Sequence, residues 1–221
     1  MLRSLIIAAA LAFGSAAHAQ TAPSASDIAS YTGLHLAAHE GRADEINRLI
    51  AQGHDLNARD RAGRTPAHVA AFASHDDAVT ALGTGGADMN ALENRVYDVL
   101  TIAAVANDPE LVSLAIQLGN KTDLITSVYD GTALIAAAHL GHHDVVARLV
   151  TGGAPLDHVN NLGWTALIEA VVLGDGGSDH IKTVEILVQA GADKTIGDRD
   201  GVTPLQHAKA RGYAEMVKLL Q

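Results

Sequence analysis

One design recurs six times along this chain, at intervals close to 33 residues. Each unit opens at a threonine or a substitute for it and continues with a short apolar run, and successive openings are 33, 33, 34, 33 and 38 residues apart. A period of this length is typical of a solenoid, in which each unit buries its apolar face only against its neighbours. The six openings are Thr32, Thr65, Asp98, Thr132, Thr165 and Thr203.

Within each unit the pattern predicts two helices joined by a turn. Thr65-Pro66 places an N-cap hydroxyl before a proline, whose missing N–H costs nothing at the first helical position. Nine residues after each opening, a residue tolerant of the left-handed conformation predicts the end of the first helix. A second apolar stripe follows and stops at another glycine. The turn residues are Gly41, Ser74, Asn107, Gly141, Gly174 and Gly212, and the later glycines are Gly53, Gly86, Gly119, Gly153 and Gly191.

The fifth unit is longer than the others by an insertion. Its second glycine comes 26 residues after its opening instead of 21, and five extra residues, 175–179, account for the difference. We expect this insertion to form a loop between the two helices.

These motifs resemble those of ankyrin-repeat proteins over about residues 27–221. The resemblance rests on Thr65-Pro66-Ala67-His68 and on the Asp-x-x-Gly-x-Thr segments at 60–65 and 198–203. It implies an all-α solenoid of six helix-turn-helix repeats with β-hairpin-like connecting loops. The repeats would start near Asp27, Asp60, Glu93, Val128, Asn160 and Asp198. The third repeat departs most from the pattern, so we expect the weakest packing there.

The first 19 residues have the three parts of a secretory signal peptide. Arg3 precedes an apolar run at 5–13, and Ala17-His18-Ala19 provides a cleavage site. The run is too short to span a bilayer, and no later segment suits one, so we expect no membrane insertion of the mature chain. Residues 20–26 are small and polar and predict a disordered leader. The alanine-rich signal favours a periplasmic protein of a Gram-negative bacterium, with secretion as the alternative.

Charge and cysteine content exclude several function classes. Without the signal, the chain has 14 basic and 25 acidic residues, a net charge of −11, which disfavours nucleic acid as a partner. The absence of cysteine removes disulfides, thiol catalysis and Cys-based metal sites.

Motifs of catalysis are absent, so we expect neither an enzyme nor a cofactor. The best metal candidate combines His139, His142 and His143, whose spacing suits one helical face. Gly141 interrupts that helix, and we therefore favour structural roles for these histidines over metal binding.

The resemblance implies a protein-binding surface at the hairpin tips and at the exposed ends of the first helices. The aromatics of the mature chain gather there, and aromatic and arginine side chains are enriched at interface hot spots. The alternative is that these rings pack over neighbouring hairpins. We predict a non-catalytic, monomeric module that binds another protein, such as a periplasmic enzyme. A small-ligand or metal-binding protein and a secreted effector of a host protein remain alternatives. The predicted contact residues are Tyr31, Arg64, Phe72, Tyr97, Tyr129, His139, Leu140, Trp164 and Leu173.

Overall fold

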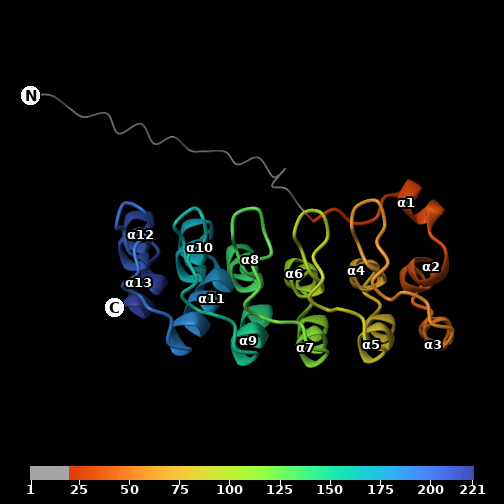
Figure 1. Cartoon of the computed structure of the whole chain (residues 1–221). Helices are drawn as coiled ribbons and strands as arrows, with labels where there is room; N and C mark the ends of the chain where they lie inside the picture. The colour runs from red at the N-terminus through yellow and green to blue at the C-terminus, as the bar shows by residue number, and fades with distance from the viewer. Residues whose placement is uncertain (1–19) are drawn as a thin grey trace, which may run out of the picture.

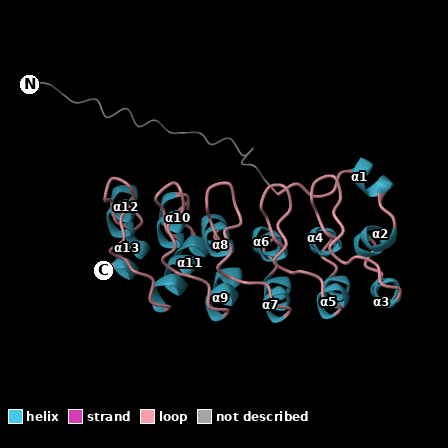
Figure 2. Cartoon of the chain, viewed as in Figure 1, coloured by secondary structure: helices cyan, strands magenta, loops and turns pink. Residues whose placement is uncertain are grey.

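The computed structural model describes residues 20–221, and the predicted signal peptide lies outside them (Figure 1). Over this range the chain forms thirteen helices and no strand, stacked in pairs along one axis (Figure 2). The predicted all-α repeat solenoid is confirmed. No helix within residues 20–221 has the length and apolar character needed to cross a membrane.

Each repeat contributes a first and a second helix to two parallel layers (Figure 1). A short extra helix, α1 (Ala25–Ser30), precedes them. The first helices are α2 (Gly33–His39), α4 (Pro66–Phe72), α6 (Val99–Val105), α8 (Ala133–Leu140), α10 (Ala166–Val172) and α12 (Pro204–Arg211). The second helices are α3 (Ala43–Ala51), α5 (Asp76–Thr84), α7 (Pro109–Gln117), α9 (His143–Thr151), α11 (Ser178–Gln189) and α13 (Ala214–Leu220).

The predicted openings are the N-caps of the first helices. The side chains of Asp98, Thr132, Thr165 and Thr203 accept the backbone N–H three residues on. At Thr65 the neighbouring His68 completes the cap, because the Thr65 N–H donates to its Nδ1 at 3.2 Å. Each cap satisfies a backbone group that a helix start leaves without an intrahelical partner.

The core repeats with the sequence. Every first helix presents a fully buried alanine five residues after its opening, which lets neighbouring helices approach closely. Every second helix except α13 adds a fully buried β-branched residue at an equivalent point, so each repeat fills the gap left by its neighbour. These residues are Ala37, Ala70, Ala103, Ala137, Ala170 and Ala208 in the first helices, and Ile46, Val79, Val112, Val146 and Val184 in the second.

The turns follow the prediction except in the fifth repeat. Asn107 at φ 57° and its equivalents elsewhere adopt the left-handed conformation. Gly174 does not; Gly176 in the insertion takes that conformation instead, at φ 75°. The predicted loop at 175–179 is too long, because Ser178 and Asp179 already belong to α11.

A hairpin loop connects each repeat to the next, and one side chain organises each loop. In the second repeat Asp60 Oδ1 accepts the backbone N–H groups of residues 62 and 64. In the fourth repeat Ser127 Oγ plays this part, so that hairpin starts one residue before the predicted Val128. The other organising residues are Glu93, Asn160 and Asp198.

The first repeat has no hairpin, and the prediction of a disordered leader at 20–26 is wrong. Ser24 forms a capping box with Asp27 and starts α1, so the helix already includes residues 25 and 26. The Thr21 carbonyl accepts a hydrogen bond from Arg64 Nη1 at 3.2 Å. Polar composition alone predicted disorder, but the residues that hold this segment lie in the second and third repeats.

The irregular third repeat carries a buried polar network. Asp98 is fully buried, and its Oδ2 accepts from Asn120 Nδ2 at 2.7 Å. Asn120 Oδ1 in turn accepts the Leu100 N–H at 3.1 Å, and Thr101 donates to Thr126 at 2.7 Å. Burial raises the pKa of Asp98. These bonds therefore join the start of α6 to the segment that follows α7.

Candidate protein-binding surface

The hairpins project from one edge of the stack, above the first helices (Figure 1). The residues predicted to contact a partner come from the hairpin segments, from the C-cap of α1 or from the ends of the first helices, and they differ in exposure. They form three groups: buried, half-buried and exposed.

Arg64 and Tyr31 are buried and serve the fold. Arg64 is 1% exposed; its guanidinium contacts Asp27 at 2.9 Å and Asp60 at 2.7 Å. The Tyr31 hydroxyl donates to Asp60 at 2.7 Å, and burial raises its pKa. The hydrogen bond from Arg64 lowers the pKa of Asp27 to about 2. Arg64 was predicted to be a contact residue; in the structure α1 covers it, where a first hairpin would otherwise stand.

Tyr97 and Trp164 are half-buried at the bases of their hairpins. The Tyr97 carbonyl accepts the Nε2–H of His68 at 3.1 Å, and the Trp164 N–H donates to Asn160 at 3.0 Å. Burial raises the pKa of the Tyr97 phenol. Phe72 is also half-buried, facing residues of the N-terminal segment. The Tyr97 and Phe72 side chains pack against the hydrophobic core, so a structural role accounts for part of the contacts of these two rings.

The exposed group centres on the fourth and fifth repeats. Tyr129 and Leu140, both predicted, are 44% and 42% exposed. Four large apolar residues that the prediction missed accompany them in the two hairpins and the positions just before them. The sequence signal was clear only at Val128, where the other hairpins have arginine or asparagine. These are Ile125, Val128, Val159 and Leu162.

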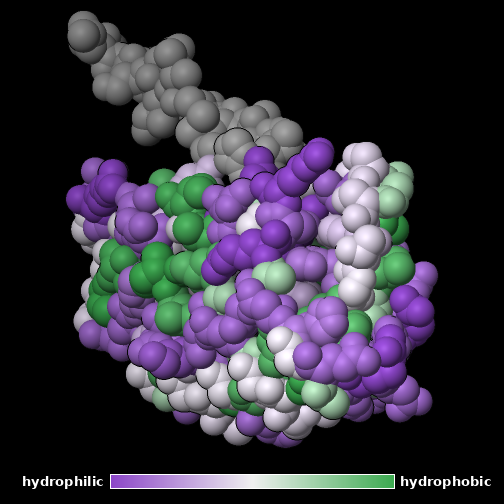
Figure 3. Space-filling model, turned by 45° about the vertical axis from the view of Figure 1, so that its right-hand side comes forward, coloured by the Kyte–Doolittle hydropathy of each residue, from purple (hydrophilic) through white to green (hydrophobic). Residues whose placement is uncertain are grey.

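We name the six residues Ile125, Val128, Tyr129, Leu140, Val159 and Leu162 the apolar tip. They are all the large apolar residues classed as exposed within residues 20–221. In the space-filling view, apolar side chains gather on the left of the visible face, whereas much of the rest is hydrophilic (Figure 3). Exposed apolar groups that cluster on a mainly polar surface often mark interaction sites.

The hairpins that carry the apolar tip are bonded to each other. The Asn161 N–H donates to the Tyr129 carbonyl at 2.9 Å, and Asn161 Nδ2 donates to the Val128 carbonyl at 3.1 Å. His158 Nε2 lies 2.6 Å from the Asp130 carbonyl. The apolar side chains thus stand on a fixed support, which lowers the entropy lost on binding.

A buried carboxylate underlies the same region. Glu169 of α10 is 4% exposed and accepts from Asn160 Nδ2 at 2.9 Å. His139, at the end of α8, brings its Nδ1 to 3.2 Å from Glu169 Oε2, while the imidazole stays about half exposed. Leu173, which follows α10, is half-buried. This network links the fourth and fifth repeats below the hairpins.

The three histidines of the metal hypothesis face different partners. His139 pairs with Glu169, His142 Nδ1 lies 2.9 Å from the Ala104 carbonyl, and His143 lies near Asp144 and Asp179. Within residues 20–221, no group of three ligand-type side chains is placed to hold an ion. His75 and His180 likewise bond carbonyls of the preceding repeat.

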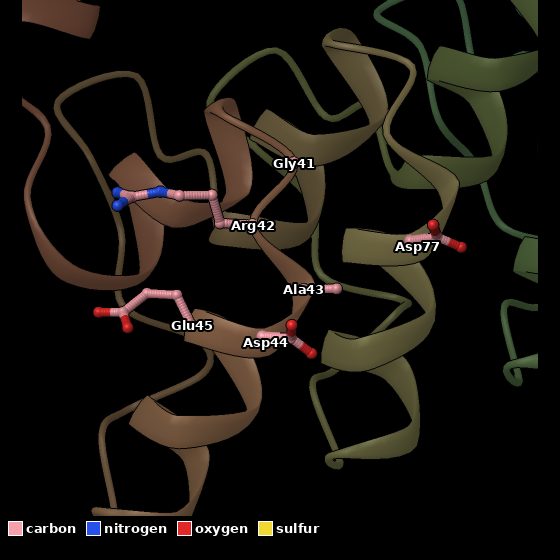
Figure 4. A pocket seen from close by; sticks show the side chains of 6 residues that line it. All are labelled: Gly41, Arg42, Ala43, Asp44, Glu45 and Asp77. Atoms are coloured by element: carbon pink, nitrogen blue, oxygen red, sulfur yellow. The ribbon is translucent and has the colours of Figure 1, made fainter.

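A surface depression lies away from the hairpins, between α3 and α5. Asp44 and Asp77 stand at its two sides, and the Arg42 side chain points away from them (Figure 4). Arg42 pairs with Glu40 at 2.7 Å. The depression is open and acidic, and it contains none of the predicted contact residues.

Comparison with known proteins agrees with the repeat architecture. The family model described as ankyrin repeats (3 copies) matches residues 5–93 and 100–198. The ankyrin repeat protein YahD of Escherichia coli (strain K12) is 34% identical over 187 residues, covering 84% of this chain and 92% of YahD.

Solved structures give the same result. An ankyrin repeat domain from Acinetobacter baumannii AYE superposes with a TM-score of 0.79 and 40% identity, covering 85% of this chain and 95% of that domain. A chain from the complex of the predatory endopeptidase Bd0816 of Bdellovibrio bacteriovorus with immunity protein Bd3460 has a TM-score of 0.69 and 25% identity, covering 86% and 97%. Ankyrin repeats generally bind other proteins and are typically non-catalytic. From its repeats, its fold and these relatives, this chain belongs to the ankyrin-repeat family.

Proposed function

We propose that this protein is an exported, non-catalytic binding module that acts in the periplasm and binds a partner protein through its apolar tip. The observation that carries the proposal is the placement of exposed large apolar side chains on two adjacent hairpins of the fourth and fifth repeats. Burying such side chains against a partner is favourable by about 25 cal/mol per Å².

The acidic residues around the apolar tip indicate the charge that a partner surface should carry. Asp123, Asp130 and Asp157 are exposed beside the apolar residues, and the chain without its signal carries a net charge of −11. A basic rim on the partner would complement them and speed association. His139 and the half-buried Trp164 flank the same surface and complete the proposed contact.

The structure of Bd0816 in complex with its immunity protein supports a comparable role, because a chain of that assembly shares this fold. A periplasmic enzyme whose activity the module modulates is therefore the partner class that we favour. The apolar run and cleavage motif before Gln20 support export.

The test compares partner capture by the wild type and by Tyr129→Ala/Leu162→Ala, using extract of the compartment to which the protein is exported. Each truncation removes a large apolar contact, so we expect affinity for the captured protein to fall at least tenfold. The control is Asp200→Ala, at the equivalent hairpin position of the sixth repeat, which should bind as the wild type does. Equal binding by all three proteins would place the contact elsewhere. Mass spectrometry of the exported protein should show Gln20 as its first residue, and an intact Met1 would contradict export with cleavage.

A further inference from the structure

The N-terminal segment before and within α1, residues 20–30, lies across the hairpins of the second and third repeats. We name it the N-terminal strap. Figure 1 shows it (red) passing along the hairpin tips toward α1. Arg64 holds its Thr21 carbonyl at 3.2 Å, and Arg95 Nη1 donates to Thr21 Oγ1 at 3.3 Å. It therefore occupies the same edge of the stack that carries the apolar tip further along.

The strap covers an apolar area without filling it. Ala22, Pro23 and Ile28 of the strap face Val69 and Phe72 of α4. Between them remains a space of about 100 Å³, which His39 and Ala73 also line. This space is partly open to solvent, and the Phe72 side chain beside it stays only half-buried under the strap.

Few contacts hold the strap in place. α1 has six residues and none of them is buried, and a helix this short is unstable by itself. Its strongest attachment is the ion pair between Asp27 and Arg64, at 2.9 Å. Segments with little buried area and few fixed contacts open at the lowest free-energy cost.

The surface beneath the strap is fixed by other contacts. Asp60 of the second hairpin holds the Arg64 guanidinium at 2.7 Å independently of the strap. Phe72 and Val69 belong to α4, whose cap and packing involve the second and third repeats. Departure of the strap would therefore leave a positioned cation beside an aromatic and an aliphatic side chain.

We propose that the strap is a displaceable internal ligand, and that the surface beneath it, formed by Arg64, Val69 and Phe72, is a second protein-binding site. Its ligand is a protein segment that places a carboxylate on Arg64 and small apolar side chains against Phe72, as Asp27, Ala22 and Pro23 do in the strap. This site is separate from the apolar tip, and its existence does not depend on the function proposed for that tip.

A labelled synthetic peptide of residues 20–31 tests the proposal. The Asp27→Arg variant sets two cations against each other and should release the strap, so the peptide should bind it at least tenfold more tightly than the wild type. The control Asp44→Arg makes the same charge change on an exposed residue of α3, and it should bind as weakly as the wild type. A peptide carrying Asp27→Asn should lose most of its affinity, because it lacks the charge that Arg64 recognises.

A second experiment uses the absence of cysteine from the chain. In Ala22→Cys/Ala73→Cys, whose positions line the same space, a reducible thiol cross-linker should fasten the strap, slow amide exchange in α1 and prevent peptide binding, and reduction should reverse these effects. Two results would overturn the proposal: no peptide binding to a folded Asp27→Arg variant, or loss of cooperative unfolding in that variant. The second result would show that the strap is an integral cap of the solenoid. Either result leaves the apolar tip to its own test.

Discussion

His68 should make the protein sensitive to mild acid. Its imidazole is completely buried; Nδ1 accepts the Thr65 N–H and Nε2 donates to the Tyr97 carbonyl at 3.1 Å. Burial lowers its pKa from about 6.5 to about 4. Protonation of Nδ1 would place a second hydrogen against the Thr65 N–H and break this hydrogen bond, which is another reason why the folded state disfavours the charged imidazole.

The sign and size follow from this pKa. As pH falls below about 6.5, the unfolded chain takes up a proton that the folded chain refuses until about pH 4. Stability falls wherever the unfolded state binds more protons, so His68 reduces the free energy of unfolding across this window and has its full effect below it. A shift of roughly 2.5 pKa units corresponds to about 3 kcal/mol.

The sixth repeat supplies a suitable substitution. Gln206 occupies the equivalent position and accepts the Thr203 N–H at 2.7 Å, which is the cap bond that His68 makes with Thr65. His68→Gln should therefore preserve the cap while removing the titration. Near pH 7 it should be less stable by about 1 kcal/mol, the usual net value of the lost bond to Tyr97. Near pH 4 it should be the more stable protein by about 2 kcal/mol.

The assay is urea unfolding followed by far-UV circular dichroism at a series of pH values. The stability curves of the wild type and His68→Gln should cross. His54→Gln, which removes an exposed histidine, is the control and should follow the wild-type curve. Parallel curves for the wild type and His68→Gln would refute the reasoning, because they would show that His68 does not cause the loss.

Two further predictions concern the third repeat. Val96→Gly should stabilise the fold by about 1 kcal/mol, because Val96 is a β-branched residue at φ 64° in the hairpin and glycine adopts this conformation without strain. Urea unfolding measures the change. A less stable variant would show that the side-chain contacts of Val96 outweigh its backbone strain. Asp98 should have the opposite pH effect to His68, because burial raises its pKa in the folded state. As pH rises above the ordinary carboxyl range, the unfolded chain loses the Asp98 proton before the folded chain does, so the free energy of unfolding falls until the pH passes the folded pKa. Asp98→Thr, which restores the residue found at the five other openings, should remove that loss, and an unchanged pH profile would contradict the assignment.

Much of the repeat geometry could be predicted because it is set within each unit. Thr132, Thr165 and Thr203 cap helices, and Asn107 turns the chain, through bonds and backbone angles that depend on close neighbours in sequence. The insertion was harder to place, because whether Ser178 and Asp179 join α11 depends on how that helix packs.

Among the predicted contact residues, Tyr129 and Leu140 are exposed on the structure, whereas Arg64 and Tyr31 are buried. All four were predicted to be contact residues from their distance along the chain to the opening residue of a repeat. Their exposure depends on what lies above each residue, and for Arg64 that is α1, 37 residues earlier in the chain at Asp27.

The sequence by itself determined a six-unit helical solenoid, because each repeat contacts mainly its neighbours and the same local pattern recurs at every unit. The tertiary structure decided the rest: that residues 20–30 cover the second and third hairpins, that Asp98 and Asn120 meet inside the third repeat, and that apolar side chains remain uncovered on the fourth and fifth. Burial is a property of the neighbours that pack on a residue, and those neighbours come from other repeats, so a pattern read within one repeat cannot fix it.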